Sequence, residues 1–290
     1  MRWSASGPGH EMTDQPIIEP LPGSVAARKP VATPNAARRS LLDDPRVLGW
    51  GSVALVLIVW ELTALLTGVN RLYLPRPTQI VVALFDMFAN GRLALDLGAT
   101  LSRVFGGFFI ALAVGIALGI WIASSDRVRA VADMFIAALY PLPKVTLIPL
   151  LIIWLGTGGP FMLTISGLGA IFPIIINTVL GVRQCDPGLV LAAHDLGATR
   201  RQVMRLVLLP SAIPSIFAGA RLGLGVSIIL VVAAEMVVGK LGLGARLYLA
   251  GQVLETEQVF AVLIVLATLG IVVTKIQDGI DFRLGRWRLA

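Results

Sequence analysis

The segment LAAHDLGATRRQVMRLVLLP, residues 191–210, has the composition of a water-facing helical element within an otherwise apolar region of the chain. Its arginines, Arg200, Arg201 and Arg205, would be costly inside a bilayer. They can anchor the segment at anionic lipid headgroups, contact another protein, or do both. We predict that this segment lies at a membrane surface between stretches that cross the membrane.

Small residues in the same segment predict close contact with a partner. Ala192 and Ala193 give a smooth surface onto which another protein can pack. Gly197 is expected to turn the chain at a helix end, where a residue with φ > 0 is often needed. Pro210 begins the next segment. We predict that Gly197 breaks the segment into two short pieces and that residues 190–205 form a short helix, with both alanines facing the partner.

The composition is that of an integral membrane protein. The 290 residues are 56% hydrophobic and 14% charged, with a mean hydropathy of +0.84. A soluble domain carries about 25% charged residues. The net charge of +7 therefore points to basic cytoplasmic loops rather than to nucleic acid. The single cysteine, Cys185, excludes an intrachain disulfide.

Apolar runs long enough to cross the roughly 30 Å hydrocarbon core of a bilayer recur six times. We therefore predict an all-α, polytopic fold with six transmembrane helices within residues 47–290. Residues 1–46 have no long apolar run and read as a disordered cytoplasmic tail, not a signal peptide. Short helices are expected after Pro77 and before Leu254, both at the outer face. The six predicted spans are residues 48–66, 97–123, 131–155, 161–180, 216–238 and 259–276.

The distribution of Lys and Arg predicts the orientation. An even number of spans places both termini on the same side of the membrane. That side carries sixteen Lys and Arg residues and the opposite side carries five, leaving out three within or at the ends of spans. Because cytoplasmic loops are enriched in these residues, the termini and residues 181–210 are expected in the cytoplasm.

Polar residues within the spans are candidates for a pathway or a gate. Pro141, Pro143 and Lys144 interrupt the third span, and Pro149 is expected to interrupt it again. Lys144 either faces a pathway or pairs with an acid, or the break lies near the cytoplasmic face and the side chain reaches water. Asn177 lies near the inner end of the fourth span.

Glu235 lies near the outer end of the fifth span, before a glycine-rich loop. We favour a structural role, in which its carboxylate orders that loop through backbone N–H groups, over a role in an outer gate. Arg103 is expected to extend toward the interface from within the second span. Glycines spaced four apart in the second and fifth spans predict close helix packing within one subunit, with a dimer interface as the less favoured interpretation.

The spacing in residues 191–210 resembles the cytoplasmic coupling motif of ABC-transporter permeases. That motif is Glu-Ala-Ala, three residues, Gly, nine residues, then Ile-x-Leu-Pro. Val207 stands at the usual Ile position and Leu191 at the usual Glu position. The resemblance makes residues 181–210 a coupling loop that contacts a separate ATPase. The predicted coupling residues are Leu191, Ala192, Ala193, His194, Asp195, Gly197, Arg200, Arg201, Leu209 and Pro210.

Further short matches cover about residues 48–288 and resemble the nitrate, sulfonate, taurine and bicarbonate branch of importer permeases. They include Leu74-Pro75-x-Pro77, Pro141-Leu142-Pro143-Lys144, Ala234-Glu235-Met236 and Gly242-Leu243-Gly244. The resemblance implies type I ABC importer architecture, with a shared core at about residues 97–280. It also implies that the chain lies in the bacterial inner membrane. Its implied partners are a second copy of the chain, two ABC ATPase subunits and a periplasmic binding protein. The substrate would be a sulfonate, taurine, nitrate or a similar small anion.

The sequence contains no Gly-x-x-x-x-Gly-Lys-Ser/Thr run, so ATP is expected to bind to the partner ATPase. The two histidines are not spaced as a metal pair, and we identify no catalytic constellation. We therefore predict no enzyme activity, cofactor or metal on this chain. Two alternatives remain open, a secondary transporter and a membrane anchor or channel without ATP coupling. Secondary transporters commonly show two related halves, which we do not find here.

Overall fold

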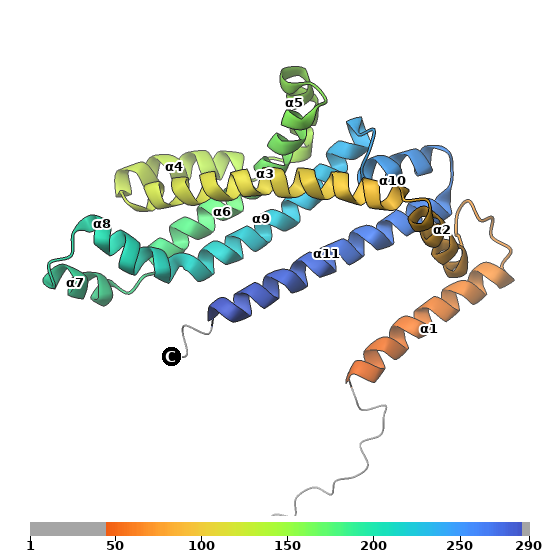
Figure 1. The fold of residues 1–290 in the computed structure, drawn as a ribbon, viewed down its shortest axis with the longest axis horizontal. Helices are drawn as coiled ribbons and strands as arrows, with labels where there is room; N and C mark the ends of the chain where they lie inside the picture. Colours follow the sequence, from red (N-terminus) through yellow and green to blue (C-terminus); the bar gives the residue numbers. More distant parts are fainter. Residues whose placement is uncertain (1–44, 286–290) are drawn as a thin grey trace, which may run out of the picture. The chain divides into compact units, whose positions relative to one another are not determined.

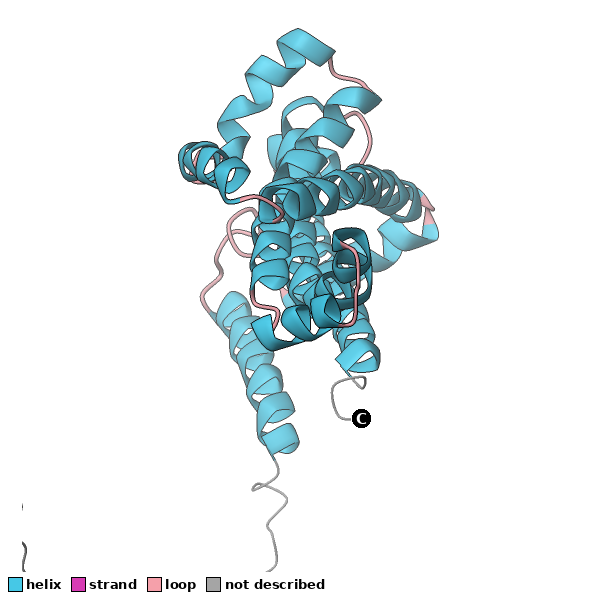
Figure 2. Cartoon of the chain, turned by 90° about the vertical axis from the view of Figure 1, so that its left-hand side faces the viewer, coloured by secondary structure: helices cyan, strands magenta, loops and turns pink. Residues whose placement is uncertain are grey.

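The structure is a computed structural model that describes residues 45–285. The predicted tail, residues 1–46, lies almost entirely outside the described residues. The chain separates into two compact units, residues 1–53 and residues 54–290, and the account below concerns the second unit unless stated otherwise. All regular elements of the described part are helical (Figure 2).

The helices follow one another without strands between them in the described range (Figure 1). The 3-10 helix is labelled η2 and the π-helix η3. The elements are α1 (Pro45–Leu66), α2 (Pro77–Ala89), α3 (Arg92–Ala123), α4 (Asp126–Leu139), η2 (Lys144–Leu147), α5 (Ile148–Leu155), α6 (Gly159–Arg183), α7 (Pro187–Asp195), α8 (Arg200–Val203), η3 (Met204–Leu208), α9 (Leu209–Val238), α10 (Leu243–Gln252) and α11 (Thr256–Gly285).

The predicted transmembrane fold is confirmed. Five helices are long and apolar enough to cross a membrane, and α4 with η2 and α5 makes a sixth span if the bent pair is counted as one. The two parts of this pair meet at 85°. The bend lies at the predicted Pro141–Pro143 interruption. The second interruption, expected at Pro149, is absent because that proline occupies the first turn of α5, where its missing N–H costs nothing.

Two predicted helix starts were wrong. The second span begins at Arg92 rather than at residue 97, because Leu93 and Asp96 are buried and extend the helix. The fifth span belongs to a continuous helix of 39 residues, Arg200–Val238, rather than beginning at residue 216. Both starts contain charged residues, and a hydropathy pattern alone does not include charged residues in a span.

The centre of the bundle consists of α3, α6 and α9, which pack side by side (Figure 1). Their contact depends on glycines, as predicted. A Cβ at Gly119 would lie 2.5 Å from Thr178 Cβ on α6. A Cβ at Gly223 of α9 would lie 3.0 Å from Ala170 Cα, also on α6. Such distances leave no room for a side chain, so these glycines set the helix separation within one subunit.

The peripheral helices differ in how they join this centre: α2, α10 and α11 share a buried core with α3, whereas α1 contributes little to it. Among residues 54–66 of α1, Ala64 is the buried residue, so this part of the helix is peripheral within the second unit. Glu61 accepts hydrogen bonds from Thr78 N (3.1 Å) and Thr78 Oγ1 (3.0 Å) at the start of α2. On the other side, Arg221 of α9 forms ion pairs with Asp278 and Asp281 of α11.

Candidate functional site

The coupling segment, residues 186–199, consists of α7 and the turn that follows it. Asp186 begins the helix by accepting a hydrogen bond of 2.8 Å from Gly188 N. Gly197 has φ +80°, and its N–H donates to His194 O at 2.9 Å. The next N–H, of Ala198, donates to Ala193 O at 3.0 Å. The predicted turn at Gly197 is therefore confirmed.

The predicted break at Gly197 is confirmed, whereas the predicted extent of the helix, residues 190–205, was wrong. The helix stops at Asp195, and a new one starts at Arg200. Thr199 caps this second helix, because Thr199 Oγ1 accepts from Gln202 N (3.4 Å) and Thr199 N donates to Gln202 Oε1 (2.8 Å). Such a reciprocal pair fixes a helix start locally. The predicted coupling residues are thus divided between two helices at an angle.

No residue of α7 is buried, and α7 rests on α8 and η3 at one end of the bundle (Figure 1). Leu191 and Leu196 are 63% and 89% exposed. Ala192 is exposed and Ala193 half-buried. His194 and Asp195 are also exposed. A short helix that presents apolar side chains to water is typical of a surface that a partner covers.

The remaining predicted coupling residues lie on the helix that leads into the membrane. Arg200 and Arg201 are exposed on α8. Leu209 packs beside a small core that contains Val182, Ala212 and Ile216. Pro210 is exposed in the first turn of α9.

A cavity of about 380 Å³ lies between the coupling segment and the turn that joins α3 to α4. Val190, Cys185 and Leu208 line it on one side, and residues 123–126 line it on the other. The ion pair between Arg183 Nη2 and Asp126 Oδ1, at 2.8 Å, joins the end of α6 to the start of α4 beside this cavity. The coupling segment is therefore adjacent to the helix pair that contains the bend.

At the bend, Lys144 has a partner that neither sequence interpretation included. Its Nζ donates a hydrogen bond of 3.0 Å to Tyr140 O, the last residue before the break. The same ammonium lies 5.3 Å from the Tyr140 ring centroid and 5.4 Å from that of Phe172 on α6. Within residues 45–285, no acidic side chain forms an ion pair with it. Pro141 and Pro143 are exposed beside it.

Asn177 does not join Lys144 in one cluster. Its Nδ2 donates to Pro173 O within α6, at 2.8 Å. Pro173 has no N–H, so the carbonyl of Gly169, four residues earlier, lacks its usual helical donor, while α9 closely approaches Pro173 O itself. A Cβ at Gly219 would lie 2.7 Å from both Pro173 O and Asn177 Cβ. Asn177 therefore stabilises α6 where α9 crosses it.

Glu235 is fully buried and surrounded by donors. Its carboxylate accepts hydrogen bonds from Thr100 Oγ1 (2.9 Å) and Arg103 Nη1 (2.5 Å) on α3. It also accepts one from Gly244 N (3.0 Å) at the start of α10. The predicted ordering of the glycine-rich loop is confirmed. Arg103 also donates to Leu241 O (2.6 Å) in the loop after α9, so its side chain extends toward that loop and binds Glu235 on the way.

A second buried ion pair completes this arrangement. Asp96 of α3, 2% exposed, accepts from Gly242 N (2.9 Å) and from Arg246 Nε (2.9 Å). Between the two carboxylates, Leu243 N donates to Thr100 Oγ1 at 2.9 Å. Three successive backbone N–H groups at the start of α10 are thus bound by side chains. We call Asp96, Thr100, Arg103, Glu235 and Arg246 the clamp.

The clamp requires glycine in the loop that it holds. Gly242 has φ +123°, and a Cβ there would lie 2.4 Å from Glu235 Cδ. At Gly244, a Cβ would lie 2.3 Å from Val232 O. Neither position has room for a side chain, so the backbone approaches the carboxylates directly.

Sequence reasoning did not find Asp96, Thr100 and Arg246, and it singled out Arg103 without pairing it with Glu235. Asp96, Thr100 and Arg103 are spaced four and three apart, which places them on one face of a helix. This spacing of polar residues on an apolar helix is a signal that could have been used. Arg246 gave no signal, because its partner is 150 positions away.

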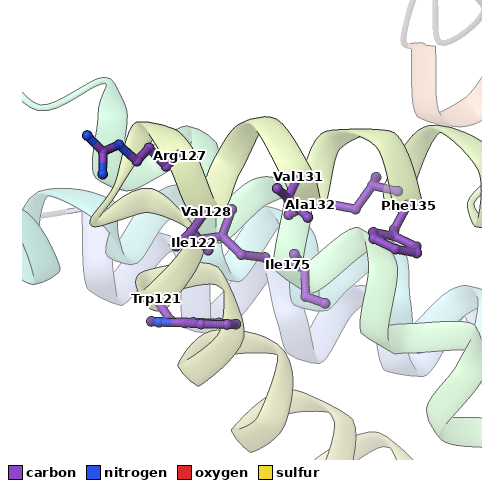
Figure 3. Close-up of a pocket in the computed structure, with 9 residues that line it drawn as sticks. Trp121, Ile122, Arg127, Val128, Val131, Ala132, Phe135 and Ile175 are labelled. Atoms are coloured by element: carbon purple, nitrogen blue, oxygen red, sulfur yellow. The ribbon is translucent and has the colours of Figure 1, made fainter.

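A larger cavity, of about 530 Å³, is lined by apolar side chains from α3, α4 and α6 (Figure 3). Trp121, Val131 and Phe135 contribute to its wall, and Arg127 is the charged residue among those that line it. The Arg127 guanidinium extends away from the other labelled side chains (Figure 3). An apolar cavity offers few polar contacts to a small anion, so we do not include it in the candidate pathway.

Comparison with known proteins identifies the class of this arrangement. The family described as "Binding-protein-dependent transport system inner membrane component" matches residues 115–286. The taurine transport system permease protein TauC of Escherichia coli (strain K12) is 33% identical over 245 residues, covering 83% of this chain and 89% of that protein. The putative aliphatic sulfonates transport permease protein SsuC of Bacillus subtilis (strain 168) is 30% identical, covering 81% of this chain and 85% of that protein.

Among solved structures, an inward-facing MetNI methionine ABC transporter superposes with a TM-score of 0.58. The alignment covers 67% of this chain and 96% of that one, at 22% sequence identity. This likeness supports the fold and, at such an identity, no more than the fold. From the matching family, the identity to curated relatives and the membrane fold, we conclude that the chain belongs to the inner-membrane components of binding-protein-dependent transport systems, the permease subunits of ABC importers.

Proposed function

We propose that this permease subunit carries a small anion and that α7 receives the movement of a separate ATPase. The observation that carries the proposal is the coupling segment itself. It is an exposed helix without a buried residue, and it joins the ends of α6 and of the helix that continues into α9. A partner that moves α7 therefore moves two of the three central helices.

We further propose that two copies of the chain form the pathway and that each copy receives one ATPase. Residues 141–143 support this assembly, because they are exposed and not helical. Irregular backbone at membrane depth is tolerated only where protein or water covers it. A second copy enclosing an aqueous path provides both. A substrate-binding protein, on which this family of transport systems depends, would deliver the substrate from the other side.

The substrate is proposed to be a small oxyanion such as a sulfonate, taurine or nitrate. Two relatives are named for taurine and aliphatic sulfonates. Pro141, Pro143, Lys144 and Asn177 remain candidates for the pathway, with Lys144 as its cation. In the described part of the chain the Lys144 ammonium forms no ion pair, so its charge is available to an anion.

We propose that the end carrying α7 faces the cytoplasm and that the clamp faces the periplasm. The sixteen-to-five distribution of Lys and Arg supports this orientation. Labelling of single cysteines with a membrane-impermeant thiol reagent in a Cys185→Ser background tests it. Lys240→Cys is expected to react from the periplasmic side, and Leu196→Cys, at the opposite end, only after the membrane is opened. The reverse pattern would overturn the orientation.

A substitution at Gly197 tests whether the turn after α7 matters for coupling. Gly197→Val places a β-branched residue at φ +80°, a conformation that costs on the order of 1–3 kcal/mol. We expect weaker binding of the ATPase with normal membrane insertion. Gly197→Asn is the matched control, because asparagine tolerates left-handed backbone, and it is expected to retain most of the binding. If both variants bind the ATPase normally, the turn is not required for docking.

The partnership as a whole is tested by purification of the tagged chain from host membranes in mild detergent. A co-purifying subunit with a Gly-x-x-x-x-Gly-Lys-Ser/Thr sequence, in equal amount with the permease, supports the proposal. Recovery of the permease without such a subunit, under conditions in which it stays folded, would contradict it. Transport in vesicles that contain the chain alone would favour a secondary transporter.

A further inference from the structure

We propose that Pro210 is a positioning residue that maintains a π turn, Met204–Leu208, as the joint between the coupling segment and α9. The inference rests on the proposed docking of α7 on the ATPase. The inference goes beyond that docking by naming the π turn as the place that sets the direction of α7. Movement of α7 would reach the membrane-spanning part of α9 through this turn. The joint is expected to change its angle during the transport cycle.

The π turn interrupts an otherwise regular helix. Val203 N donates to Thr199 O at 2.9 Å, which is the ordinary spacing of four residues. Six residues later, Leu209 N donates to Met204 O, a spacing of five. A π turn holds one extra residue, so it rotates the preceding helix by about 100° and displaces it by about 1.5 Å relative to an uninterrupted α-helix. Such turns are rare and frequently lie at functional sites.

Pro210 provides a physical cause for the π turn. A proline in a helix has no N–H to donate, and its ring clashes with the carbonyl four residues earlier, here Leu206 O. Widening the turn moves that carbonyl away from the ring. Pro214 lies inside α9 four residues later, yet the helix passes it without a π turn. The widening is therefore specific to the turn before Pro210.

The parts on either side of the turn are fixed by their own contacts. Beyond it, Ala212 is fully buried, and a Cβ at Gly181 of α6 would lie 3.0 Å from Ala212 O and 2.7 Å from Ser215 Cβ. α9 is therefore held to α6 from Ala212 onward. Before the turn, α8 has its own capping box at Thr199, and α7 packs against α8 and η3.

The turn itself contains no buried residue. Leu206 is 72% exposed, and Arg205 is exposed as well. A segment with few buried contacts and a weakened helical hydrogen-bond pattern opens more easily than its neighbours. Because both flanking parts are fixed, a change in the angle between α7 and α9 is expected to concentrate in these five residues.

Two variants test the role of the turn. Deletion of Leu206 removes the extra residue and forces an α-helical turn, and Pro210→Ala allows one to form. In reconstituted complexes, both variants are expected to bind the ATPase. Both are expected to transport less substrate per ATP hydrolysed. For the deletion we expect a loss of about tenfold, which is within the usual range of coupling between two sites. Pro214→Ala, beyond the fixed contact at Ala212, is the matched control and is expected to transport normally. Normal transport per ATP in the deletion variant would overturn the proposal.

A distance measurement in the otherwise unaltered complex decides the matter if the deletion variant does not fold. Spin labels on exposed positions Gln202 and Leu222 span the π turn, whereas labels on Leu222 and Val237 lie on α9 alone. The spanning distance is expected to differ between the nucleotide-free and ATP-bound complexes, while the control distance stays constant. A distance between Gln202 and Leu222 that is the same in both complexes would overturn the proposal that the π turn acts as a joint. Failure of the docking proposal can be distinguished from failure of the joint. If α7 does not dock on the ATPase, Ala193→Trp would leave ATPase binding intact.

Discussion

Glu235→Ala is expected to destabilise the folded protein by about 3–5 kcal/mol, the range found when one partner of a buried ion pair is removed. The change leaves Arg103 without its carboxylate, and it leaves Gly244 N without an acceptor. Gly244 is buried, so the hydrogen bond lost by its N–H is not replaced by water, whereas the partly exposed Arg103 is compensated only in part. Since a typical domain is stable by only about 5–15 kcal/mol, the loss is a large part of the total.

The measurement is thermal unfolding of the purified protein in one detergent, together with protease sensitivity of the loop over residues 239–244. Glu257→Gln is the matched control, because this glutamate forms no ion pair among the described residues. Glu257→Gln is expected to have the same unfolding temperature as the original protein. An unfolding temperature for Glu235→Ala equal to that of the control would mean that the clamp does not stabilise α10.

A double variant separates the ion pair from the loop contacts. In Glu235→Gln with Arg103→Met, both charges are removed, while the glutamine Oε1 can still accept from Gly244 N. Removing both partners of a buried pair costs less than removing one. We therefore expect the double variant to be more stable than Glu235→Ala. The opposite order would assign the stabilisation to Arg103 and Leu241 O rather than to the ion pair.

The second large effect is expected at the coupling segment. Ala193→Trp is expected to weaken binding of the ATPase by about tenfold or more while the permease still inserts and folds. Ala193 and Val190 are the half-buried residues of α7, which otherwise faces water and packs against η3, so a large side chain at Ala193 is expected to displace either η3 or the partner. Overpacking of a close contact costs about 1–3 kcal/mol, and about 1.4 kcal/mol corresponds to tenfold in affinity.

Pull-down of the ATPase and substrate-stimulated ATP hydrolysis in vesicles measure this effect. Ala89→Trp, an exposed alanine at the end of α2, is the control for the same change of residue outside the coupling segment. Leu191→Glu, at a position that is 63% exposed, is expected to be tolerated because water reaches the carboxylate. Normal coupling in Ala193→Trp would mean that α7 only anchors the loop and that the ATPase contacts another surface.

Several features could be predicted from the sequence because they are local. The membrane spans depend on runs of apolar residues, which bury in lipid whatever their neighbours are. The turn at Gly197 depends on the conformational freedom of one glycine, and its φ of +80° agrees with that expectation. The bend after Tyr140 depends on two prolines that cannot continue a helix. The family resemblance relied on the same local patterns.

Where a helix starts or stops depended on contacts that the pattern does not show. The break at Gly197 was predicted, but the sequence pattern did not show where the helix over residues 190–205 ends and the next one begins. The structure divides it, because Thr199 and Gln202 cap a new start. Similarly, α3 begins at Arg92 because the polar residue Asp96 is buried, and a hydropathy pattern places such a residue outside a span.

The sequence by itself determined the fold class, the apolar spans and the turn at Gly197, because each follows from residues close together in the chain. Only the tertiary structure decided that Asp96, Thr100 and Arg103 meet Glu235 and Arg246. Glu235 is 132 positions from Arg103, and Arg246 is 150 positions from Asp96. The packing of α3, α9 and α10 brings these charges together and buries the carboxylates of Asp96 and Glu235, which are stable there because each has an arginine partner.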